Sequence, residues 1–243
     1  MKVSINKSDC STGQESPDPV TDRDLVEESM RGFHENWFCI GRREQLTAPG
    51  SFFVENVAGD SLIVTLDDGN NPRALFNTCT HRGTQLTPAS NGNFPKRRII
   101  CPYHRWVFGC DGRPLRAPNM QHRDDFNLEE WPLHQGVICG WEGFLLVGVG
   151  GQPGPVEAIT HAVSRQVRPW RLSELTVARR EQKRYECGWK SVLTDLKGDR
   201  RGPVHTELVP NLLLLPGDQH VETHRLVPLD SRQTVVVSEW LGE

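Results

Sequence analysis

The chain has 243 residues, enough to bury the core of one large domain or of two modest ones. A formal net charge of −3 gives no reason to expect the basic face that binds nucleic acid. The longest aliphatic run, Leu212 to Leu215, is far shorter than the roughly 20 residues of a membrane-spanning helix. No basic, apolar signal segment opens the sequence, so we expect a cytoplasmic protein.

The first 32 residues are predicted to precede the folded domains. Residues 1–20 are rich in Ser, Asp, Pro and Lys without hydrophobic periodicity, which is typical of a mobile tail. Thr21-Asp22-Arg23-Asp24 has the composition of a helix start, and a short amphipathic helix is expected to run from there to Met30.

From Trp37 onward the sequence alternates short strand-like runs with turn signals, which predicts a small antiparallel β domain. The dipeptides Asp68-Gly69, Asn91-Gly92 and Asp111-Gly112 favour tight turns between strands. The expected strands cover residues 37–41, 51–57, 61–66, 73–77, 98–100, 107–110 and 144–149.

Two short pairs of potential metal ligands follow strand-like runs within this domain. Cys79-Thr80-His81 and Cys101-Pro102-Tyr103-His104 each offer one thiolate and one imidazole, and 19 residues separate the pairs. Such ligands hold either a tetrahedral zinc ion or a [2Fe-2S] cluster in which the thiolates bind one iron and the imidazoles the other. Zinc sites usually place both cysteines before both histidines, whereas the order here suits two similar loops that each give one ligand to each iron.

The neighbours of both pairs resemble the cluster-binding loops of the Rieske family. His81 is followed by Arg82-Gly83 and His104 by Arg105-Trp106, which matches the forms C-x-H-R-G and C-P-Y-H-x-W. The resemblance implies a [2Fe-2S] cluster in a Rieske domain over residues 33–150. The ligands implied by this resemblance are Cys79, His81, Cys101 and His104.

Arg105 stands where the Rieske family usually has glycine. Its permanent charge either raises the reduction potential of the cluster or helps to dock the electron donor, and the plain alternative is an arginine in open solvent. Tyr103, Trp106 and Trp141 are expected to pack around the two loops, where apolar cover limits water. The other cysteines are expected to be small buried residues or spare thiols: Cys10, Cys39, Cys110, Cys139 and Cys187.

A Gly- and Pro-rich linker over residues 148–155 is predicted to lead into a second, α+β region. Val156 to Val167 has helical spacing, and four later runs are expected to form an antiparallel meander, over residues 177–185, 211–215, 220–227 and 233–240. By resemblance to the Rieske oxygenases, residues 156–243 form a helix-grip, START-like catalytic domain that is apparently incomplete. The predicted fold class is therefore α+β, with a tail and short helix over residues 1–32 ahead of both domains.

In the Rieske oxygenases the helix-grip domain binds a mononuclear iron through two histidines and a carboxylate. The landmark of that site is N-W-K, then D or E, then Y-H-x₄-H, and this chain has Gly188-Trp189-Lys190, Asp195 and Pro203-Val204-His205. His205 is thus an iron-ligand candidate by resemblance. Where the first histidine should stand, the chain reads Lys197-Gly198-Asp199-Arg200-Arg201.

Two explanations of this departure remain open. In one, segments around the iron site are missing from the sequence, between Leu196 and Gly202 and near Leu208-Val209. In the other, the site has degenerated, because an arginine cannot bind iron. His220 and His224 share one face of a predicted strand but lack a third ligand, so we expect a structural role for them.

The resemblance implies the terminal oxygenase component of a Rieske non-heme iron system. A ferredoxin or a flavin reductase would then donate electrons to the cluster, and a mononuclear Fe(II) would use them with O₂ to hydroxylate or demethylate a small organic substrate. The same resemblance implies a homotrimer and leaves open whether one or two oxygen atoms are inserted. The alternatives are a Rieske electron-transfer protein with a degenerate or absent iron site, and a zinc-stabilised ligand-binding module.

Overall fold

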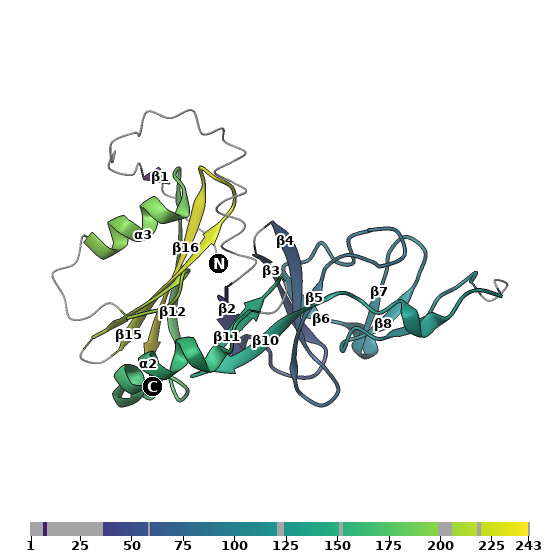
Figure 1. Cartoon of the computed structure of the whole chain (residues 1–243), viewed down its shortest axis with the longest axis horizontal. Coiled ribbons are helices and arrows are strands. Elements are labelled where there is room, and N and C mark those ends of the chain that lie inside the picture. The colour runs from purple at the N-terminus through teal and green to yellow at the C-terminus, as the bar shows by residue number, and fades with distance from the viewer. Residues whose placement is uncertain are drawn as a thin grey trace. The chain divides into compact units, whose positions relative to one another are not determined.

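The computed structural model describes residues 7–8, 36–57, 59–120, 124–150, 153–198, 206–217 and 220–242, and the chain forms two compact units (Figure 1). The metal-loop unit comprises residues 41–56 and 60–139 and contains both ligand pairs. The sheet unit comprises residues 1–40, 57–59 and 140–243. The predicted domain limits at residues 33, 150 and 156 follow the family's domains and stay a prediction.

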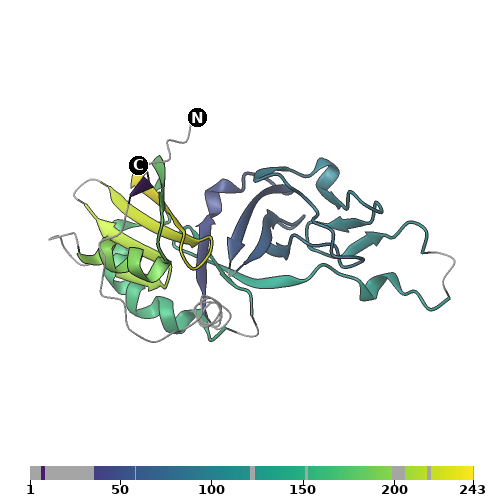
Figure 2. The same ribbon diagram turned by 90° about the horizontal axis from the view of Figure 1, so that it is seen from above.

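The metal-loop unit consists of short antiparallel strands in two sheets (Figure 2). Short 3-10 helices cover Arg43–Gln45, Pro95–Arg97 and Leu128–Glu130, and the strands are β3 (Ser51–Val57), β4 (Asp60–Leu66), β5 (Pro72–Phe76), β6 (Asn91–Asn93), β7 (Arg98–Ile100), β8 (Val107–Gly109), β9 (Pro114–Arg116) and β10 (Gln135–Trp141). One sheet contains the strands β10-β5-β4-β3-β6 in that order, and the other has the order β7-β8-β9. The chain passes between the units within β2 (Phe38–Arg42), on either side of residues 57–59, and within β10.

The core of the metal-loop unit lies directly beneath the two ligand pairs. Ile63, Leu75, Ile99 and Phe108 come from four different strands, are fully buried and pack in one hydrophobic cluster. Cys79 and Cys101 belong to the same hydrophobic cluster and are each 1% exposed. The core therefore holds both thiols out of water.

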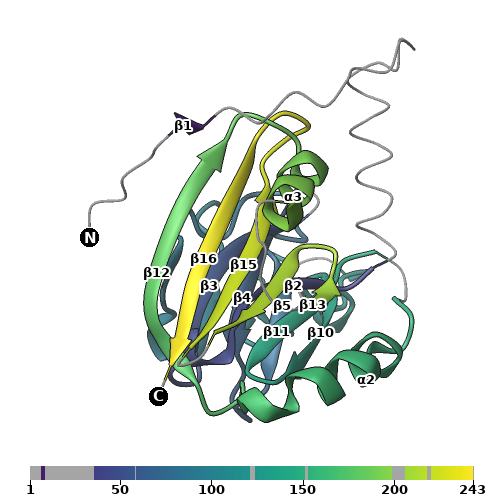
Figure 3. The same ribbon diagram turned by 90° about the vertical axis from the view of Figure 1, so that its left-hand side faces the viewer.

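The sheet unit contains a six-stranded sheet with helices packed on it (Figure 3). The strands, in their order across the sheet, are β1 (Lys7–Ser8), β12 (Thr176–Tyr185), β16 (Thr234–Gly242), β15 (Val221–Pro228), β14 (Leu212–Pro216) and β13 (Thr206–Val209). All neighbours are antiparallel except β1 and β12. The remaining elements are β11 (Phe144–Gly148), α2 (Val156–Val167), a 3-10 helix (Arg168–Trp170) and α3 (Trp189–Gly198).

Helix α3 packs on the sheet through Val192, which contacts a cluster that includes Leu226 of β15 and Val236 of β16. Helix α2 buries Thr160, Val163 and Val167, a spacing that places all three side chains on one helical face. Among the described residues, neither helix is long and apolar enough to cross a membrane.

The predicted α+β class is confirmed, and most expected strands agree with the structure within one or two residues. Five strands and one α-helix were not predicted: β1, β6, β9, β10, β13 and α3. The turn predicted at Asn91-Gly92 is wrong, because these residues belong to β6, which pairs with β3. Gly92 leaves room there for the Phe52 ring. Within the expected tail, Lys7 and Ser8 form β1, while the expected helix over residues 21–30 lies outside the described residues.

Candidate metal centre

The first ligand pair lies on a tight hairpin that follows β5. The backbone N–H of Cys79 donates to the carbonyl of Thr84 at 2.8 Å, and the N–H of Gly83 donates back to the carbonyl of Cys79 at 2.8 Å. Gly83 has a φ of 68°, the left-handed conformation that glycine adopts without steric cost. These bonds close the tip around His81.

The second pair lies on a hairpin between β7 and β8 that is closed in the same way. The N–H of Cys101 donates to the carbonyl of Trp106 at 2.8 Å, and the N–H of Arg105 donates to the carbonyl of Cys101 at 3.2 Å. Arg105 has a φ of 60° and therefore occupies the backbone position that Gly83 occupies in the first hairpin. A non-glycine residue in this conformation costs roughly 1–2 kcal/mol.

Like side chains of the two hairpins lie together. The Cys79 thiol is hydrogen-bonded to the Cys101 thiol. The imidazole rings of His81 and His104 lie edge to face with their centroids 4.8 Å apart. The four predicted site residues are thus brought together as a thiol pair and an imidazole pair.

The thiol pair lies in an environment suited to a bound metal. Burial raises the pKa of the Cys79 thiol to about 11, and the adjacent Cys101 thiol contributes to the increase. The backbone N–H groups of His81 and Arg82 act in the opposite direction, because they hydrogen-bond to the Cys79 sulfur and stabilise its thiolate. A metal would displace the proton, and these donors would then help to set its reduction potential.

The imidazole pair has nitrogen atoms available for a metal. Burial lowers the pKa of His81, and the neighbouring His104 and Arg82 lower it further, which favours the neutral form that binds a metal. The Nδ1 atoms of His81 and His104 are buried and have no hydrogen-bond partner among the described residues. Buried polar atoms without a partner are rare in folded proteins, and a metal ion would satisfy both.

Aromatic rings cover the imidazole pair, as expected for two of the three predicted residues. Trp106 is fully buried and stacks on His81 with centroids 4.7 Å apart, and Tyr103 lies over His104 at 3.7 Å while remaining 60% exposed. The prediction is wrong for Trp141, because its ring stacks on Phe144 and its indole N–H donates to Ser164 Oγ within the sheet unit. In the metal-loop unit, Phe126 and Trp131 pack edge-on against Trp106.

The base of the first hairpin is held by the amide of Asn77, which is 1% exposed. Its Nδ2 donates to the carbonyl of Thr87 at 2.8 Å, and the N–H of Thr87 donates to its Oδ1 at 2.9 Å. This role of Asn77 was not predicted. The signal that was available is an asparagine directly after a buried strand, a position where its side chain can replace ladder hydrogen bonds.

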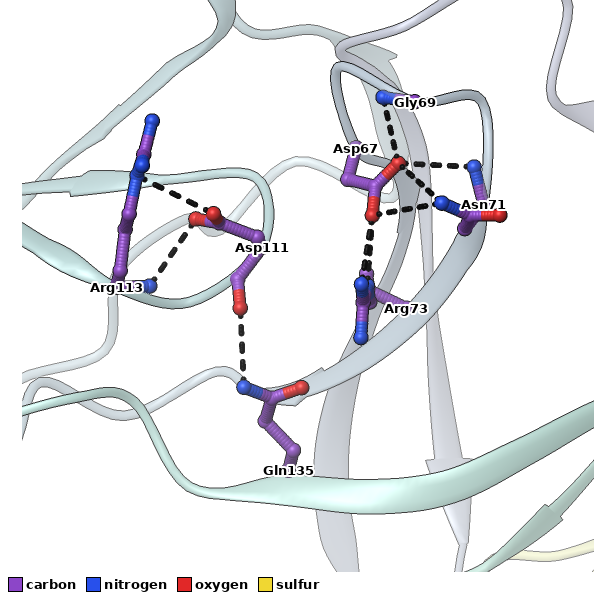
Figure 4. A network of polar contacts seen from close by, with 7 residues as sticks. All are labelled: Asp67, Gly69, Asn71, Arg73, Asp111, Arg113 and Gln135. Atoms are coloured by element: carbon purple, nitrogen blue, oxygen red, sulfur yellow. Dashed lines mark hydrogen bonds and ion pairs between the residues drawn. The ribbon is translucent and has the colours of Figure 1, made fainter.

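Two carboxylates fix turns at the ends of β5 and β8 that lie away from the hairpins (Figure 4). Asp67 accepts hydrogen bonds from the N–H groups of Gly69 and Asn71, both at 2.9 Å, and pairs with Arg73 at 2.8 Å. Burial alone would raise the pKa of Asp67, but the bonds from Asn71 and Arg73 outweigh it and lower that pKa. At the turn after β8, Asp111 pairs with Arg113 in the same manner.

The donor set fits a two-iron cluster better than a single ion. Among the described residues, no three His, Cys, Asp or Glu side chains converge closely enough to hold one metal ion. A tetrahedral zinc site would need all four ligands around one point, whereas a [2Fe-2S] cluster separates its thiolate-bound iron from its imidazole-bound iron. The paired arrangement matches the second requirement.

The candidate mononuclear iron site lies mostly outside the described residues, and so does His205. Of the landmark residues that are described, Trp189, Lys190 and Asp195 lie on α3. Of the two histidines expected on one strand, His224 lies in β15, buried, with its Nδ1 2.8 Å from Ser238 Oγ and its Nε2 3.3 Å from Glu222 Oε1. His220 precedes the strand and is exposed.

The remaining cysteines largely follow the expectation of small buried residues and free thiols. Cys39 and Cys110 are buried thiols outside any disulfide, and Cys139 is half-buried and likewise not disulfide-bonded. The expectation of a spare thiol is wrong for Cys187, because this residue is disulfide-bonded. Cys10 lies outside the described residues.

Comparison with known proteins identifies residues 36–132 as a match to the Rieske [2Fe-2S] domain. The chain is 27% identical over 161 residues to the glycine betaine monooxygenase oxygenase subunit of Chromohalobacter salexigens, covering 66% of this chain and 36% of that protein. It is 26% identical over 189 residues to the carnitine monooxygenase oxygenase subunit of Escherichia coli, covering 76% of this chain and 50% of that protein. The chain thus spans half or less of the length of these curated relatives.

The fold is also found among solved structures. A quaternary ammonium Rieske monooxygenase superposes with a TM-score of 0.78 at 18% sequence identity, covering 91% of this chain and 73% of that one. At this identity the likeness concerns the fold alone, and it extends over both the Rieske-type β domain and the second sheet.

Proposed function

Because this chain belongs to the family of Rieske non-heme iron oxygenases, we propose that it is the electron-accepting, terminal oxygenase component of such a system. The proposed cluster ligands are the thiolates of Cys79 and Cys101 and the imidazoles of His81 and His104. One observation carries the proposal: the two thiols lie together and the two imidazoles lie together, although each hairpin supplies one of each.

The residues of the metal-loop unit have separable tasks in this proposal. A [2Fe-2S] cluster, when bound, accepts and passes on single electrons. Cys79 and Cys101 would hold its inner side within the hydrophobic core, where water is excluded. His81 and His104 are only half-buried and would hold its outer side near the surface, where an electron enters or leaves. Trp106 keeps the His81 ring in one orientation by stacking on it.

The relatives suggest the substrate class. Their names refer to glycine betaine and carnitine, so we propose a small quaternary ammonium compound, hydroxylated or demethylated with O₂ at a mononuclear Fe(II). His205 is the proposed iron ligand in this chain, and a ferredoxin or flavin reductase is the proposed electron donor. A homotrimer and a cytoplasmic location complete the proposal.

A Rieske electron-transfer protein without a mononuclear iron is the second candidate. It is favoured by the sequence between Asp195 and His205, which contains no histidine where the family has its first iron ligand. Arg200 and Arg201, which stand nearest to that position, cannot replace it because guanidinium has no lone pair to donate.

Iron and acid-labile sulfide analysis of the purified chain separates these functions. Three irons and two sulfides per chain, with turnover of glycine betaine, carnitine or choline, are expected of the oxygenase. Two irons and two sulfides without turnover would establish the electron carrier. Zinc without sulfide would refute both and leave a zinc-stabilised ligand-binding module.

A further inference from the structure

Positive charge is concentrated around the ligand pairs of an otherwise acidic chain. Residues 79–116 contain a single acidic residue, Asp111, while the whole chain has a net charge of −3. The segment contains seven basic residues: Arg82, Lys96, Arg97, Arg98, Arg105, Arg113 and Arg116. A surface charged opposite to the rest of its protein orients an approaching partner of the complementary charge.

Two of these arginines stand at the hairpin tips themselves. Arg82 directly follows His81 and Arg105 directly follows His104, and both side chains are exposed. Within the described part of the chain neither pairs with a carboxylate, whereas Arg97 and Arg113 are held by Asp68 and Asp111. The two guanidinium groups therefore keep their charge available to a partner.

The backbone at Arg105 shows that no local requirement favours arginine there. Its φ of 60° is the conformation that Gly83 adopts at the equivalent position of the first hairpin, and a side chain at this φ is strained. Glycine would relieve the strain and leave the closing hydrogen bond from residue 105 to Cys101 intact. Arginine instead places a permanent charge, on an exposed side chain, at the tip of the second hairpin.

We propose that Arg82 and Arg105 form a cationic rim around the imidazole edges that docks an acidic electron-donor protein by pairing with its carboxylates. The inference rests on the proposed function, in which one electron passes from the reduced donor to the [2Fe-2S] cluster without proton transfer. Tyr103, 60% exposed and in contact with the His104 ring, adds an aromatic surface beside the imidazole pair. Rim charges act mainly on the association rate and on its dependence on salt.

The test measures binding of an acidic plant-type [2Fe-2S] ferredoxin to the intact holoprotein by stopped-flow and by titration, from low to high salt. Arg82→Glu/Arg105→Glu should slow association about tenfold or more at low salt and remove most of the salt dependence. Arg165→Glu/Arg168→Glu is the matched control, since it makes the same change of charge at exposed arginines of the sheet unit. Ferredoxin with amidated carboxylates should bind the wild type as weakly as native ferredoxin binds the double variant.

Arg105→Gly separates docking from folding. It should weaken ferredoxin binding several-fold while the melting temperature stays the same or rises, because the strained backbone is relieved. A lower melting temperature with unchanged binding would assign Arg105 to the fold and overturn the proposal.

Three other outcomes would also decide the matter. Equal effects of the rim and control variants, or no effect of either, would refute docking at this rim. A change in the sedimentation mass of the double variant would show that the rim contacts a second copy of the chain instead. Visible absorption and iron content are measured first, because a wild type without a cluster would refute the proposed function rather than the docking surface.

Discussion

The Cys79 hairpin and the Cys101 hairpin close their tips by the same two backbone hydrogen bonds, yet their bases are held differently. The Cys101 hairpin continues into the ladder of β7 and β8, in which Ile99 faces Phe108. The Cys79 hairpin has only an isolated bridge below its tip and depends on the side-chain amide of Asn77. Two hairpin tips with the same backbone geometry can therefore be held in place by different means, one by a β ladder and the other by a side-chain amide.

The largest expected effect tests whether both tips hold one cluster. Cys79→Ala and Cys101→Ala should each reduce bound iron and sulfide to about a tenth of the wild-type content or less, because both thiolates are proposed to bind the same iron. Cys110→Ala is the control, since this buried thiol is free and stands outside both tips. Metal analysis showing a full cluster in either ligand variant would break the equivalence of the two hairpins.

The next effect tests the difference between the bases. Asn77→Ala should destabilise the protein by about 2–3 kcal/mol, because it leaves the buried N–H and carbonyl of Thr87 without partners. Urea unfolding measures the change, and Asn93→Ala, at an exposed position, should be near neutral. Similar values for the two variants would mean that the side-chain amide is not the support of the first hairpin.

A smaller effect is expected at the turn that leads into β5, the strand before the first hairpin. Asp67→Asn should cost about 1–2 kcal/mol at pH 7, because Arg73 and two backbone N–H groups lose a charged acceptor. The folded-state pKa of Asp67 is lowered, so its contribution is complete above an unfolded-state pKa of about 3.9 and is lost as the pH falls through the folded value. Unfolding curves of variant and wild type should therefore converge in acid, and a constant difference would contradict this assignment.

The smallest effect concerns the left-handed residue that each tip requires. Gly83→Ala should cost about 1 kcal/mol through the backbone alone, since its added Cβ would meet no atom within 4 Å. Arg105→Gly should be neutral or stabilising by up to about 1 kcal/mol, because relief of strain is offset by the freedom of glycine in the unfolded chain. Thermal unfolding measures the stability change of each variant. If both substitutions destabilised the protein, residues 83 and 105 would not occupy equivalent backbone positions.

The sequence was sufficient to predict most of the metal-loop strands and the candidate ligands because their signals are local. Cys-x-His and Cys-x-x-His lie within single hairpins, and the flanking runs alternate in hydrophobicity. The strand β10 was missed because its two glycines interrupt the apolar run of residues 137–139 and weaken the strand pattern, and because its pairing with β5 is long-range. The supporting role of Asn77 was missed because its partner, Thr87, stands ten residues away across the loop.

Prediction was weaker in the sheet unit. The bounds of α2 were predicted as observed, because its apolar residues recur with helical spacing. Helix α3 was read only as part of an iron-site landmark, and its helical character comes from packing on Leu226 and Val236, which lie far away in the sequence. His205 lies outside the described residues, so its role as an iron ligand stays a prediction.

The central claim is that the two hairpins present a thiolate pair to one iron and an imidazole pair to the other. Pulsed electron paramagnetic resonance on the dithionite-reduced protein tests it directly, because it detects ¹⁴N nuclei bound to a paramagnetic iron. The account predicts two histidine nitrogen couplings in the wild type, with the signal altered by substitution of either His81 or His104 and unaffected by substitution of His134. A reduced cluster without nitrogen coupling, or a metal content of zinc without sulfide, would contradict it.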